Sequence, residues 1–298
     1  MTVRETSQAM LHFEFNETLE QARARNIRDA LLEDIGRGDW TAELLPPGRR
    51  VRAQVRVREP AVLAGRDWFE GCMRSVGPDT KLQWRCDEGT DMTADSVVCD
   101  LEGDARALLT AERPALNFLQ LLSGVATVTR QYVQAIAGAS PNPRGCVVLD
   151  TRKTLPGLRQ AQKYAVRVGG GSNQRLALWH GILIKENHIA AAGGVAQALR
   201  RAQELHSGVD IQIEVETLGQ LREALAAGAT SVLLDNFAPA LMREAVAITA
   251  GRALLEASGG LSLEWLRDIA ATGVDRISIG KLTKDVRAID YSMRVVAD

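Results

Sequence analysis

After Pro143 the sequence alternates short apolar segments with helical stretches, and this alternation limits the fold more than any other feature. Six segments have the length of strands, namely Cys146–Asp150, Ile182–Lys185, Ile211–Glu216, Ser231–Asp235, Ala253–Ala257 and Arg276–Ile279. The stretches between them, such as Val195–His206 and Leu218–Ala227, have the pattern of amphipathic helices. Strands that alternate with helices are typical of a parallel sheet. Such a sheet either closes into a barrel or stays open and doubly wound.

The position of the polar residues favours the barrel. They lie where the strands end: Asp150, Arg152, Lys153, Lys185, Glu214, Glu216, Asp235, Glu256, Ser258 and Gly280. A barrel builds its active site from the carboxyl ends of several strands. An open sheet binds ligands only near a topological switch point, so fewer of its strands need polar ends. We therefore predict an α/β barrel with its active site at this rim.

The first third of the chain predicts a smaller α+β unit. A helical pattern over Leu19–Ile35 stops at Gly36, and alternating apolar residues from Val51 indicate a half-buried strand. Shorter apolar runs complete a small sheet with one solvated face, namely Ala61–Ala64, Leu82–Cys86 and Val97–Leu101. A long helix is then expected from Pro114, a good first-turn residue, toward Gly138.

Composition excludes several classes of protein. A net charge of -1 gives no overall attraction to nucleic acid or to an anionic membrane. The four cysteines include no C-x-x-C pair, which suits reduced thiols and argues against structural zinc. No apolar run approaches the roughly 20 residues that span a bilayer. We expect a cytoplasmic protein.

The 35-residue stretch from Thr151 to Lys185 is basic and contains no acidic residue, whereas about four acids would be expected there from the composition. Its basic residues are Arg152, Lys153, Arg159, Lys163, Arg167, Arg175 and Lys185. The spacing by fours of Arg159, Lys163 and Arg167 fits a solvated helix face. The other four lie at strand ends or beside a glycine loop and predict a binding site for an anion.

Two groups of glycines have different interpretations. Gly169–Gly171 follows a helix and is either a helix cap with a turn or a direct ligand contact. Ser258, Gly259 and Gly260 follow one late strand and Gly280 follows the next. Free backbone NH groups in late barrel loops commonly bind phosphate. These two loops therefore predict a phosphate site.

The acids and bases at the rim leave several roles open. Glu214 and Asp235 could bind Mg²⁺, bind the hydroxyls of a sugar, or neutralise nearby lysines as buried partners. His188 is a candidate acid or base, although a lone histidine is more often structural. Lys185, at the end of an apolar strand, also fits a Schiff-base lysine and so supplies a rival class of enzyme.

Several motifs together resemble the quinolinate phosphoribosyltransferases, also called carboxylating nicotinate-nucleotide pyrophosphorylases. The motifs are Asp39–Thr41, Leu45–Pro46, Glu112–Asn117, Ser123–Ala126, Asp150–Arg159, Lys163–Val166, Gly169–Gly171, Asn173, Arg175, Leu183–Ile189, Glu214–Glu216, Leu234–Asn236, Leu255–Gly259 and Ile277–Gly280. They cover nearly the whole chain, and the run from Asp150 is long and specific.

The resemblance implies an N-terminal α+β open-faced sandwich domain followed by an incomplete parallel α/β barrel. It divides the chain into residues 1–125 and 126–286, with residues 287–298 expected to pack back on the first domain. The implied reaction uses Mg²⁺ and transfers a phosphoribosyl group from phosphoribosyl pyrophosphate to quinolinate. The products are nicotinate mononucleotide, pyrophosphate and CO₂, a step of de novo NAD synthesis. A homodimer or larger homo-oligomer with a shared active site is implied.

The resemblance also implies roles for single residues. Quinolinate would be bound by Arg152, Gln174, Arg175 and Lys185, together with Arg113 from the partner subunit. The catalytic residues Lys153, Glu214 and Asp235 would bind phosphoribosyl pyrophosphate, with Glu214 and Asp235 also near the metal. Its 5′-phosphate would be bound by Ser258, Gly259, Gly260 and Gly280.

Some positions depart from the pattern of the family. Gln174 stands where histidine is frequent, Trp179–His180 replaces a common Tyr-Asp, Asp285 stands where histidine is frequent, and Pro114 replaces a usual threonine. A neutral amide can donate a hydrogen bond to a carboxylate but carries no charge. Alternative functions are a sister transferase for another aromatic acid, a Schiff-base lyase that uses Lys185, and a non-catalytic paralogue that binds a phosphorylated metabolite.

Overall fold

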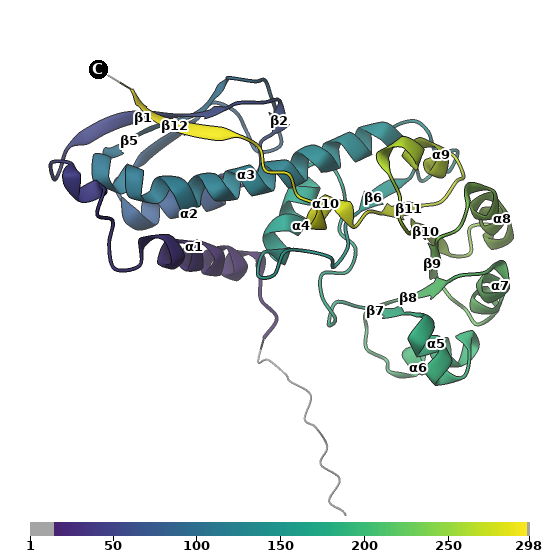
Figure 1. The fold of residues 1–298 in the computed structure, drawn as a ribbon. Coiled ribbons are helices and arrows are strands. Elements are labelled where there is room, and N and C mark those ends of the chain that lie inside the picture. The colour runs from purple at the N-terminus through teal and green to yellow at the C-terminus, as the bar shows by residue number, and fades with distance from the viewer. Residues whose placement is uncertain (1–14, 297–298) are drawn as a thin grey trace, which may run out of the picture.

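The structure, a computed structural model, describes residues 15–296 and contains an antiparallel sheet with helices at one end and a parallel sheet with helices at the other (Figure 1). The N-terminal helices are α1 (Leu19–Ile35), the short helix η1 (Ala42–Leu44), α2 (Arg66–Val76) and α3 (Ala105–Ile136). Within the described part of the chain, no helix is both long and apolar enough to cross a membrane. The α+β unit followed by a parallel α/β unit confirms the predicted fold class.

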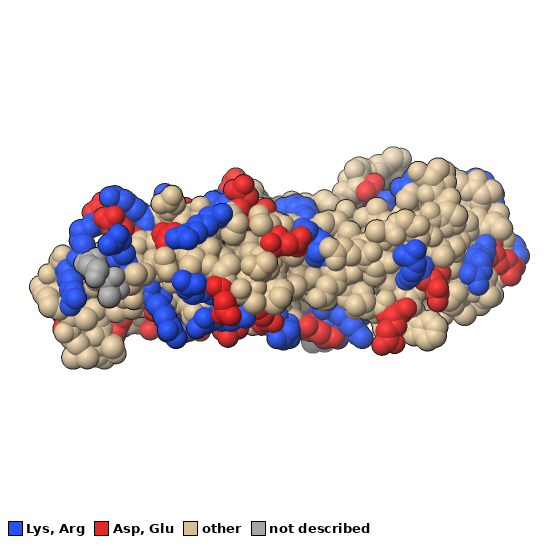
Figure 2. Space-filling model, turned by 90° about the horizontal axis from the view of Figure 1, so that it is seen from above, with Lys and Arg blue, Asp and Glu red and all other residues tan. Residues whose placement is uncertain are grey.

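The antiparallel sheet has the strand order β12-β1-β5-β3. Its strands are β1 (Arg50–Val57), β3 (Lys81–Trp84), β5 (Val97–Asp104) and β12 (Tyr291–Val296). Ala53, Val55 and Val57 are buried, which confirms the period of two in β1. The outer face carries charges of both signs side by side (Figure 2). Two of its ion pairs are Arg50 with Glu102 and Arg85 with Asp100, so the sheet is solvated on one face as predicted.

One apolar run predicted for this sheet lies elsewhere. Strand β2 (Ala61–Val62) pairs with β4 (Asp91–Met92) in a separate two-stranded sheet. Both β2 residues are buried, and the backbone NH of Val62 donates to the hydroxyl of Thr127 on α3. The run is apolar because it packs against α3 rather than because it joins the main sheet.

Helix α3 begins nine residues before the predicted start at Pro114, so that prediction was wrong. Asp104 caps the helix, because its side chain accepts a hydrogen bond from the backbone NH of Ala107 at 3.1 Å. Pro114 lies inside the helix and is buried. The 32-residue helix runs from beneath the antiparallel sheet to the parallel strands (Figure 1) and is continuous across residues 125–126.

The six parallel strands follow the order β6-β11-β10-β9-β8-β7. They are β6 (Val147–Leu149), β7 (Gly181–Ile184), β8 (Asp210–Val215), β9 (Ser231–Asp235), β10 (Leu254–Ser258) and β11 (Arg276–Ser278). In the described chain β6 and β7 are the two edges, and β6 is extended only by a bridge between Leu149 and Ser172. The sheet is therefore an incomplete barrel, as predicted.

Helices cover the outside of this barrel (Figure 1). They are α4 (Arg159–Val168), α5 (Glu186–Ala192), α6 (Val195–Glu204), α7 (Leu218–Ala226), α8 (Pro239–Thr249), η2 (Leu263–Trp265), α9 (Leu266–Ala270) and α10 (Lys281–Lys284). Buried apolar residues on α6 and α7, such as Leu199 and Leu221, form the layer between helices and strands. After α10 the chain returns to the antiparallel sheet, where β12 pairs with β1.

Candidate active site

The carboxyl ends of the parallel strands form one rim, and most of the predicted site residues lie there. Ser258 is level with Asp235 in the pairing of β10 with β9. Val215 is level with Leu234 in the pairing of β8 with β9, so Glu214 and Asp235 belong to neighbouring strand ends. Lys185 follows β7, and Gly280 follows β11 by two residues.

Lys185 and Glu214 form an ion pair between the ends of the neighbouring strands β7 and β8. The Nζ atom of Lys185 lies 3.2 Å from Oε2 of Glu214, and the Glu214 side chain is only 12% exposed. Burial raises the pKa of Glu214, while Lys185 lowers it and the negative charge of Asp235 raises it further. The protonation of Glu214 thus depends on how many cations lie beside it.

A loop of restricted conformation lies next to Asp235. The Asn236 backbone is left-handed, with φ 55°, and its NH donates to the carbonyl of Ser258 at 3.0 Å. Gly259 has φ 104°, and an added Cβ would collide with the Asn236 side chain and lie 3.0 Å from its backbone nitrogen. This position therefore requires glycine, for reasons of both conformation and space.

Lys153 is held beside the other predicted phosphate-binding glycine. Its carbonyl accepts a hydrogen bond from the Thr283 hydroxyl at 2.8 Å, and its NH donates to the Thr151 hydroxyl at 3.1 Å. A Cβ added at Gly280 would lie 3.3 Å from Cδ of Lys153. The lysine side chain therefore crosses Gly280, and its exposed end is free to meet an anion at the rim.

Arg152 and Arg175 have unsatisfied donors. Their Nε atoms are buried and have no hydrogen-bond partner within residues 15–296. Burial lowers the pKa of Arg175, and the positive charge of Arg152 lowers it further. Nη1 of Arg175 donates to the carbonyl of Gly181 at 2.9 Å. Two like charges with free donors near each other favour binding of an anion between them.

Lys163 does not lie on a solvated helix face, so the interpretation of Arg159, Lys163 and Arg167 as one such face was wrong. Lys163 is 1% exposed, pairs with the buried Asp150 and donates to the carbonyl of Gln174 at 3.0 Å. Arg167 is exposed, whereas Arg159 donates to the hydroxyl of Thr154 at 3.1 Å. Helical spacing alone could not distinguish these environments, because the partner Asp150 lies outside the helix, directly after β6.

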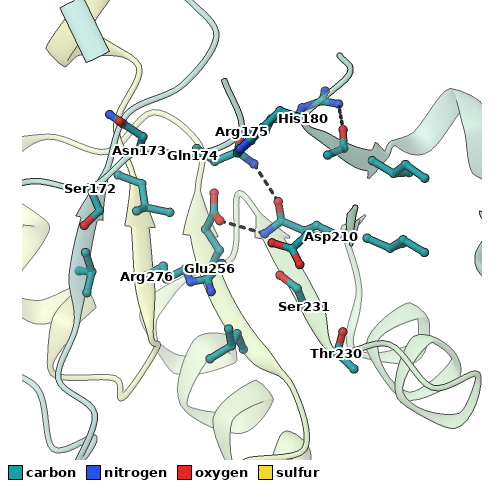
Figure 3. A pocket seen from close by; sticks show the side chains of 17 residues that line it. Ser172, Asn173, Gln174, Arg175, His180, Asp210, Thr230, Ser231, Glu256 and Arg276 are labelled. Carbon is teal, nitrogen blue, oxygen red and sulfur yellow. Dashed lines mark hydrogen bonds between the residues drawn. The ribbon is translucent and has the colours of Figure 1, made fainter. Parts of the chain in front are cut away.

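Gln174 belongs to a chain of polar groups inside the barrel (Figure 3). Its Nε2 donates to Oε1 of Gln212 at 3.0 Å, and Nε2 of Gln212 donates to Oε2 of Glu256 at 2.9 Å. Because the buried Glu256 accepts a hydrogen bond, the amide nitrogen of Gln212 must face Glu256. The amide oxygen of Gln212 then faces the amide nitrogen of Gln174. Gln212 on β8 thus points into the barrel and is buried.

The remaining predicted residues lie apart from the rim or have structural contacts. Arg113 is exposed in the first third of α3, beneath the antiparallel sheet (Figure 1). His188 accepts a hydrogen bond at Nδ1 from the backbone NH of Lys185 at 3.0 Å, which caps α5. Gly169 ends α4, and its added Cβ would lie 2.5 Å from the carbonyl of Ala126, so this glycine packs against α3.

Sequence reasoning passed over two residues that shape the rim, Asn236 and Thr283. Asn236 contacts Gly259, and Thr283 anchors the backbone of Lys153. Asparagine tolerates a left-handed backbone better than most residues. An asparagine directly after Asp235 could therefore have indicated a tight turn at the end of the strand. The bond from Thr283 joins residues 130 positions apart, and no local pattern reveals it.

The groups at the rim suit an anionic substrate better than a metal held by protein alone. Within the described residues, no three His, Cys, Asp or Glu side chains are grouped so as to hold a metal ion. Cations and free donors come from Arg152, Lys153, Arg175 and Lys185, and acids come from Glu214 and Asp235. Fold and site together define an α/β-barrel enzyme that acts on a multiply anionic substrate.

Comparison with known proteins identifies the family. The model described as "Quinolinate phosphoribosyl transferase, N-terminal domain" matches residues 39–123, and the model for the C-terminal domain matches residues 125–294. The chain belongs to the quinolinate phosphoribosyltransferase family. The family and the enzyme class predicted from the sequence are thereby confirmed.

Individual relatives are similar over almost their full length. A nicotinate-nucleotide pyrophosphorylase [carboxylating] of Mycobacterium leprae is 43% identical over 90% of this chain and 95% of its own. A probable enzyme of the same name from Bacillus subtilis is 39% identical over 89% of this chain and 90% of its own. The solved nicotinate-nucleotide pyrophosphorylase of Francisella tularensis superimposes with a TM-score of 0.89 at 40% identity, covering 96% of this chain and all of that one.

Proposed function

We propose that this protein transfers a phosphoribosyl group from phosphoribosyl pyrophosphate to quinolinate and releases pyrophosphate and CO₂, forming nicotinate mononucleotide. The ion pair between Lys185 and Glu214 at the carboxyl end of the barrel is the observation that most supports the proposal. It puts a cation for a substrate carboxylate beside an acid able to stabilise positive charge on a ribose. The names of the relatives described above agree with this reaction.

The acid substrate would be bound by the cations of the rim. Quinolinate carries two adjacent carboxylates, and the proposal assigns them to Arg152, Arg175 and Lys185. The unpartnered Nε atoms of the two arginines support this assignment, because each retains a donor that a carboxylate can satisfy. Gln174 is assigned to the same substrate through its second amide hydrogen, since Gln212 occupies one donor direction.

Phosphoribosyl pyrophosphate would occupy the opposite side of the rim. We assign its 5′-phosphate to the loop of Ser258, Gly259 and Gly260 and to Gly280, and its ribose pyrophosphate to Lys153, Glu214 and Asp235. Gly259 permits the close approach of Asn236. The backbone NH groups of this loop would bind the phosphate. When pyrophosphate leaves, C1 of the ribose becomes positively charged, and the two carboxylates would stabilise it electrostatically.

Mg²⁺ would accompany the pyrophosphate. This ion is usually held by one or two carboxylates together with substrate phosphates and water. Glu214 and Asp235 fit that donor set, because they lie at neighbouring strand ends and their charges interact. When bound, the ion would neutralise charge on the leaving pyrophosphate.

Loss of CO₂ needs little from the protein. Once the ring nitrogen carries the ribose, the pyridinium ring accepts the electron pair released from the neighbouring carboxylate carbon. A proton then replaces the carboxylate at that carbon. The residues of the site would hold the second carboxylate in place during this step, which is the role assigned to the arginines.

We further propose that the active protein is at least a homodimer. Arg113 is exposed and lies on α3 away from the strand ends, so it is available to a partner's site rather than to its own (Figure 1). Large apolar side chains of the same N-terminal unit are also exposed, with Trp40 at 86% and Leu44 at 81%. Apolar side chains at such exposure are typical of contact surfaces between proteins.

An assay of substrate choice tests the proposal. The protein is incubated with Mg²⁺, phosphoribosyl pyrophosphate and either quinolinate or nicotinate, and pyrophosphate and CO₂ are measured. We expect both products with quinolinate and neither with nicotinate. Turnover of nicotinate without quinolinate would instead support the sister transferase, while no pyrophosphate with either acid would contradict a transferase. Glu214→Gln is the control, since it keeps the shape and removes the charge.

A further inference from the structure

A cavity of about 520 Å³ lies inside the barrel at the end opposite the candidate active site (Figure 3). Its wall contains the first residue of every parallel strand: Val147, Gly181, Asp210, Ser231, Leu254 and Arg276. Because all six strands run in the same direction, these residues surround the amino-terminal mouth of the barrel. The volume lies in the range typical of small-molecule sites.

The cavity and the rim are separate. The lining residues include none of Lys185, Glu214, Asp235, Ser258 and Gly280, which all lie at the carboxyl ends. On β8 and β10 its wall reaches Gln212 and Glu256, which lie halfway along these strands. A molecule in the cavity would therefore enter through a different mouth from the substrates proposed above.

Glu256 supplies an unsatisfied buried group in this wall. Its side chain is 1% exposed, and its Oε2 atom already accepts a hydrogen bond from Gln212. No hydrogen bond of good geometry reaches Oε1 from residues 15–296, although Ser278 lies nearby. Burial raises the pKa of Glu256, which favours the protonated form. In the protonated form, Oε1 is the oxygen that can donate the proton, because Oε2 accepts from Gln212.

Arg276 supplies a cation that makes no direct contact with an acid among residues 15–296, although its charge acts on Glu256 and opposes the rise in the pKa of that carboxyl. Its side chain lines the cavity and is half-buried, and in the described chain its guanidinium has no hydrogen bond or ion pair. Asp210, the other acid of the wall, is exposed at the mouth. Arg175 also borders the cavity, but it is assigned above to the substrate carboxylates and is not part of the site inferred here.

Part of the wall is apolar, alongside polar residues such as Asn173, His180 and Thr230. Leu149, Ile182, Ile211 and Leu254 line the cavity together with Val147. Such a surface excludes water from one part of a ligand, while the arginine and the carboxyl group bind another part. A fully hydrated ion such as sulfate would leave this apolar surface unused.

We propose that the amino-terminal cavity is a second binding site, for a small monocarboxylate with a planar apolar body. The carboxylate is bound by Arg276 and by the free carboxyl oxygen of Glu256, and the apolar body packs on Ile211 and Leu254. This site lies beyond the proposed transferase activity, and its occupancy does not depend on that activity.

Binding of 4-fluorobenzoate, followed by ¹⁹F NMR titration, tests the site directly. The full-length protein and three variants are compared: Arg276→Gln in the cavity, Lys185→Gln at the rim and Arg200→Gln on an exposed helix surface. We expect saturable binding that weakens about tenfold or more in Arg276→Gln and stays unchanged in the other two. The thermal melting temperature checks that each variant is folded.

Two further measurements separate charge from shape. 4-Fluorobenzylamine has a similar body but a positive charge, and we expect no saturable binding of it. Glu256→Gln keeps the side-chain shape and a donor toward the cavity without a titratable group, so binding should be retained in this variant. The proposal is overturned if 4-fluorobenzoate does not bind saturably, if only Lys185→Gln weakens it, or if the amine binds equally well.

Discussion

Lys163 and Asp150 form an ion pair that is almost completely closed to solvent, at the end of the strand from which the loop with Arg152 and Lys153 begins. Asp150 also accepts hydrogen bonds from the side chain of Asn173 at 2.6 Å and from the backbone NH of Gln174 at 2.9 Å. The pair thus ties together two segments of the basic stretch. The hydrogen bonds and the ion pair satisfy the buried charges of Asp150 and Lys163. Removing either side chain should therefore lower the free energy of unfolding.

Substituting Lys163 by methionine should destabilise the protein strongly. The change leaves Asp150 buried without its counter-charge, which typically costs about 3–5 kcal/mol of unfolding free energy. Urea unfolding followed by circular dichroism measures this loss. The matched control is Lys81→Met, because Lys81 pairs with Glu102 at the surface and its loss should cost less than about 1 kcal/mol. Equal effects of the two substitutions would contradict a buried pair of structural importance.

Substituting Lys185 by alanine should lower activity and shift its pH dependence. Lys185 lowers the pKa of Glu214, so without it the pKa of Glu214 rises further above the ordinary value. If ionised Glu214 is required, the acidic limb of kcat/KM moves to higher pH. At neutral pH we expect a loss of about 10²-fold. Lys81→Ala should leave both rate and profile unchanged, and an unshifted acidic limb in Lys185→Ala would argue against this coupling.

Substituting Gly259 by alanine should impair use of phosphoribosyl pyrophosphate. The added methyl group meets Asn236 in a left-handed backbone, so the loop must move, at a cost of about 1–3 kcal/mol. We expect a higher KM for phosphoribosyl pyrophosphate and a smaller change in the KM for quinolinate. Gly251→Ala is the control, because Gly251 also has positive φ, at 74°, but has open space around it. A normal KM in Gly259→Ala would exclude a tightly fitted phosphate loop.

Substituting Glu256 by glutamine should alter how stability depends on pH. Burial raises the pKa of Glu256 in the folded state, so the folded protein binds more protons than the unfolded chain above the ordinary glutamate range. Stability from this group is complete at low pH and is lost as pH rises toward the folded-state pKa. The glutamine variant does not titrate and therefore does not lose this stability. Its free energy of unfolding should increase relative to that of the wild type as pH rises. Urea unfolding at several pH values between 5 and 8 measures the difference, and parallel curves would contradict it.

Mixing two inactive variants should restore activity if Arg113 acts in the partner's site. A mixed dimer contains one Arg113→Ala subunit and one Lys153→Ala subunit. One of its two sites would then contain both substitutions, and the other site would contain neither. Random exchange of subunits would then give about a quarter of wild-type activity. The assay is pyrophosphate release after mixing, with native mass spectrometry to verify exchange. Exchange without recovery would place Arg113 outside the active site.

Periodicity predicted the elements whose pattern is local. Helix α1 spans the predicted residues Leu19–Ile35, because its amphipathic pattern and the stop at Gly36 lie within the element itself. The six parallel strands were found for the same reason. The start of α3 was missed because Asp104 ends a strand and caps the next helix at once, so no loop separates the two patterns.

Chemistry at the strand ends was also predictable, since a parallel sheet brings all carboxyl ends to one side. Contacts between distant segments were not. The buried state of Lys163 depends on Asp150, and the orientation of Gln174 depends on Gln212 and Glu256, all of which come from other segments of the chain. Arg276 was overlooked for a different reason. It is the first residue of its strand, whereas active-site residues of a barrel are expected at the carboxyl ends of the strands.

The last strand, β12, pairs with the first, β1, in a sheet whose other strands come from the first 104 residues. A chain leaving the ribosome cannot complete this sheet until residue 296 has emerged, after the whole barrel has been synthesised. During translation β1 thus presents an open edge, with unpaired backbone groups that can recruit another chain. Ribosomes that stall within the barrel segment would release chains prone to misassembly, and rapid barrel folding would shorten the time of that exposure.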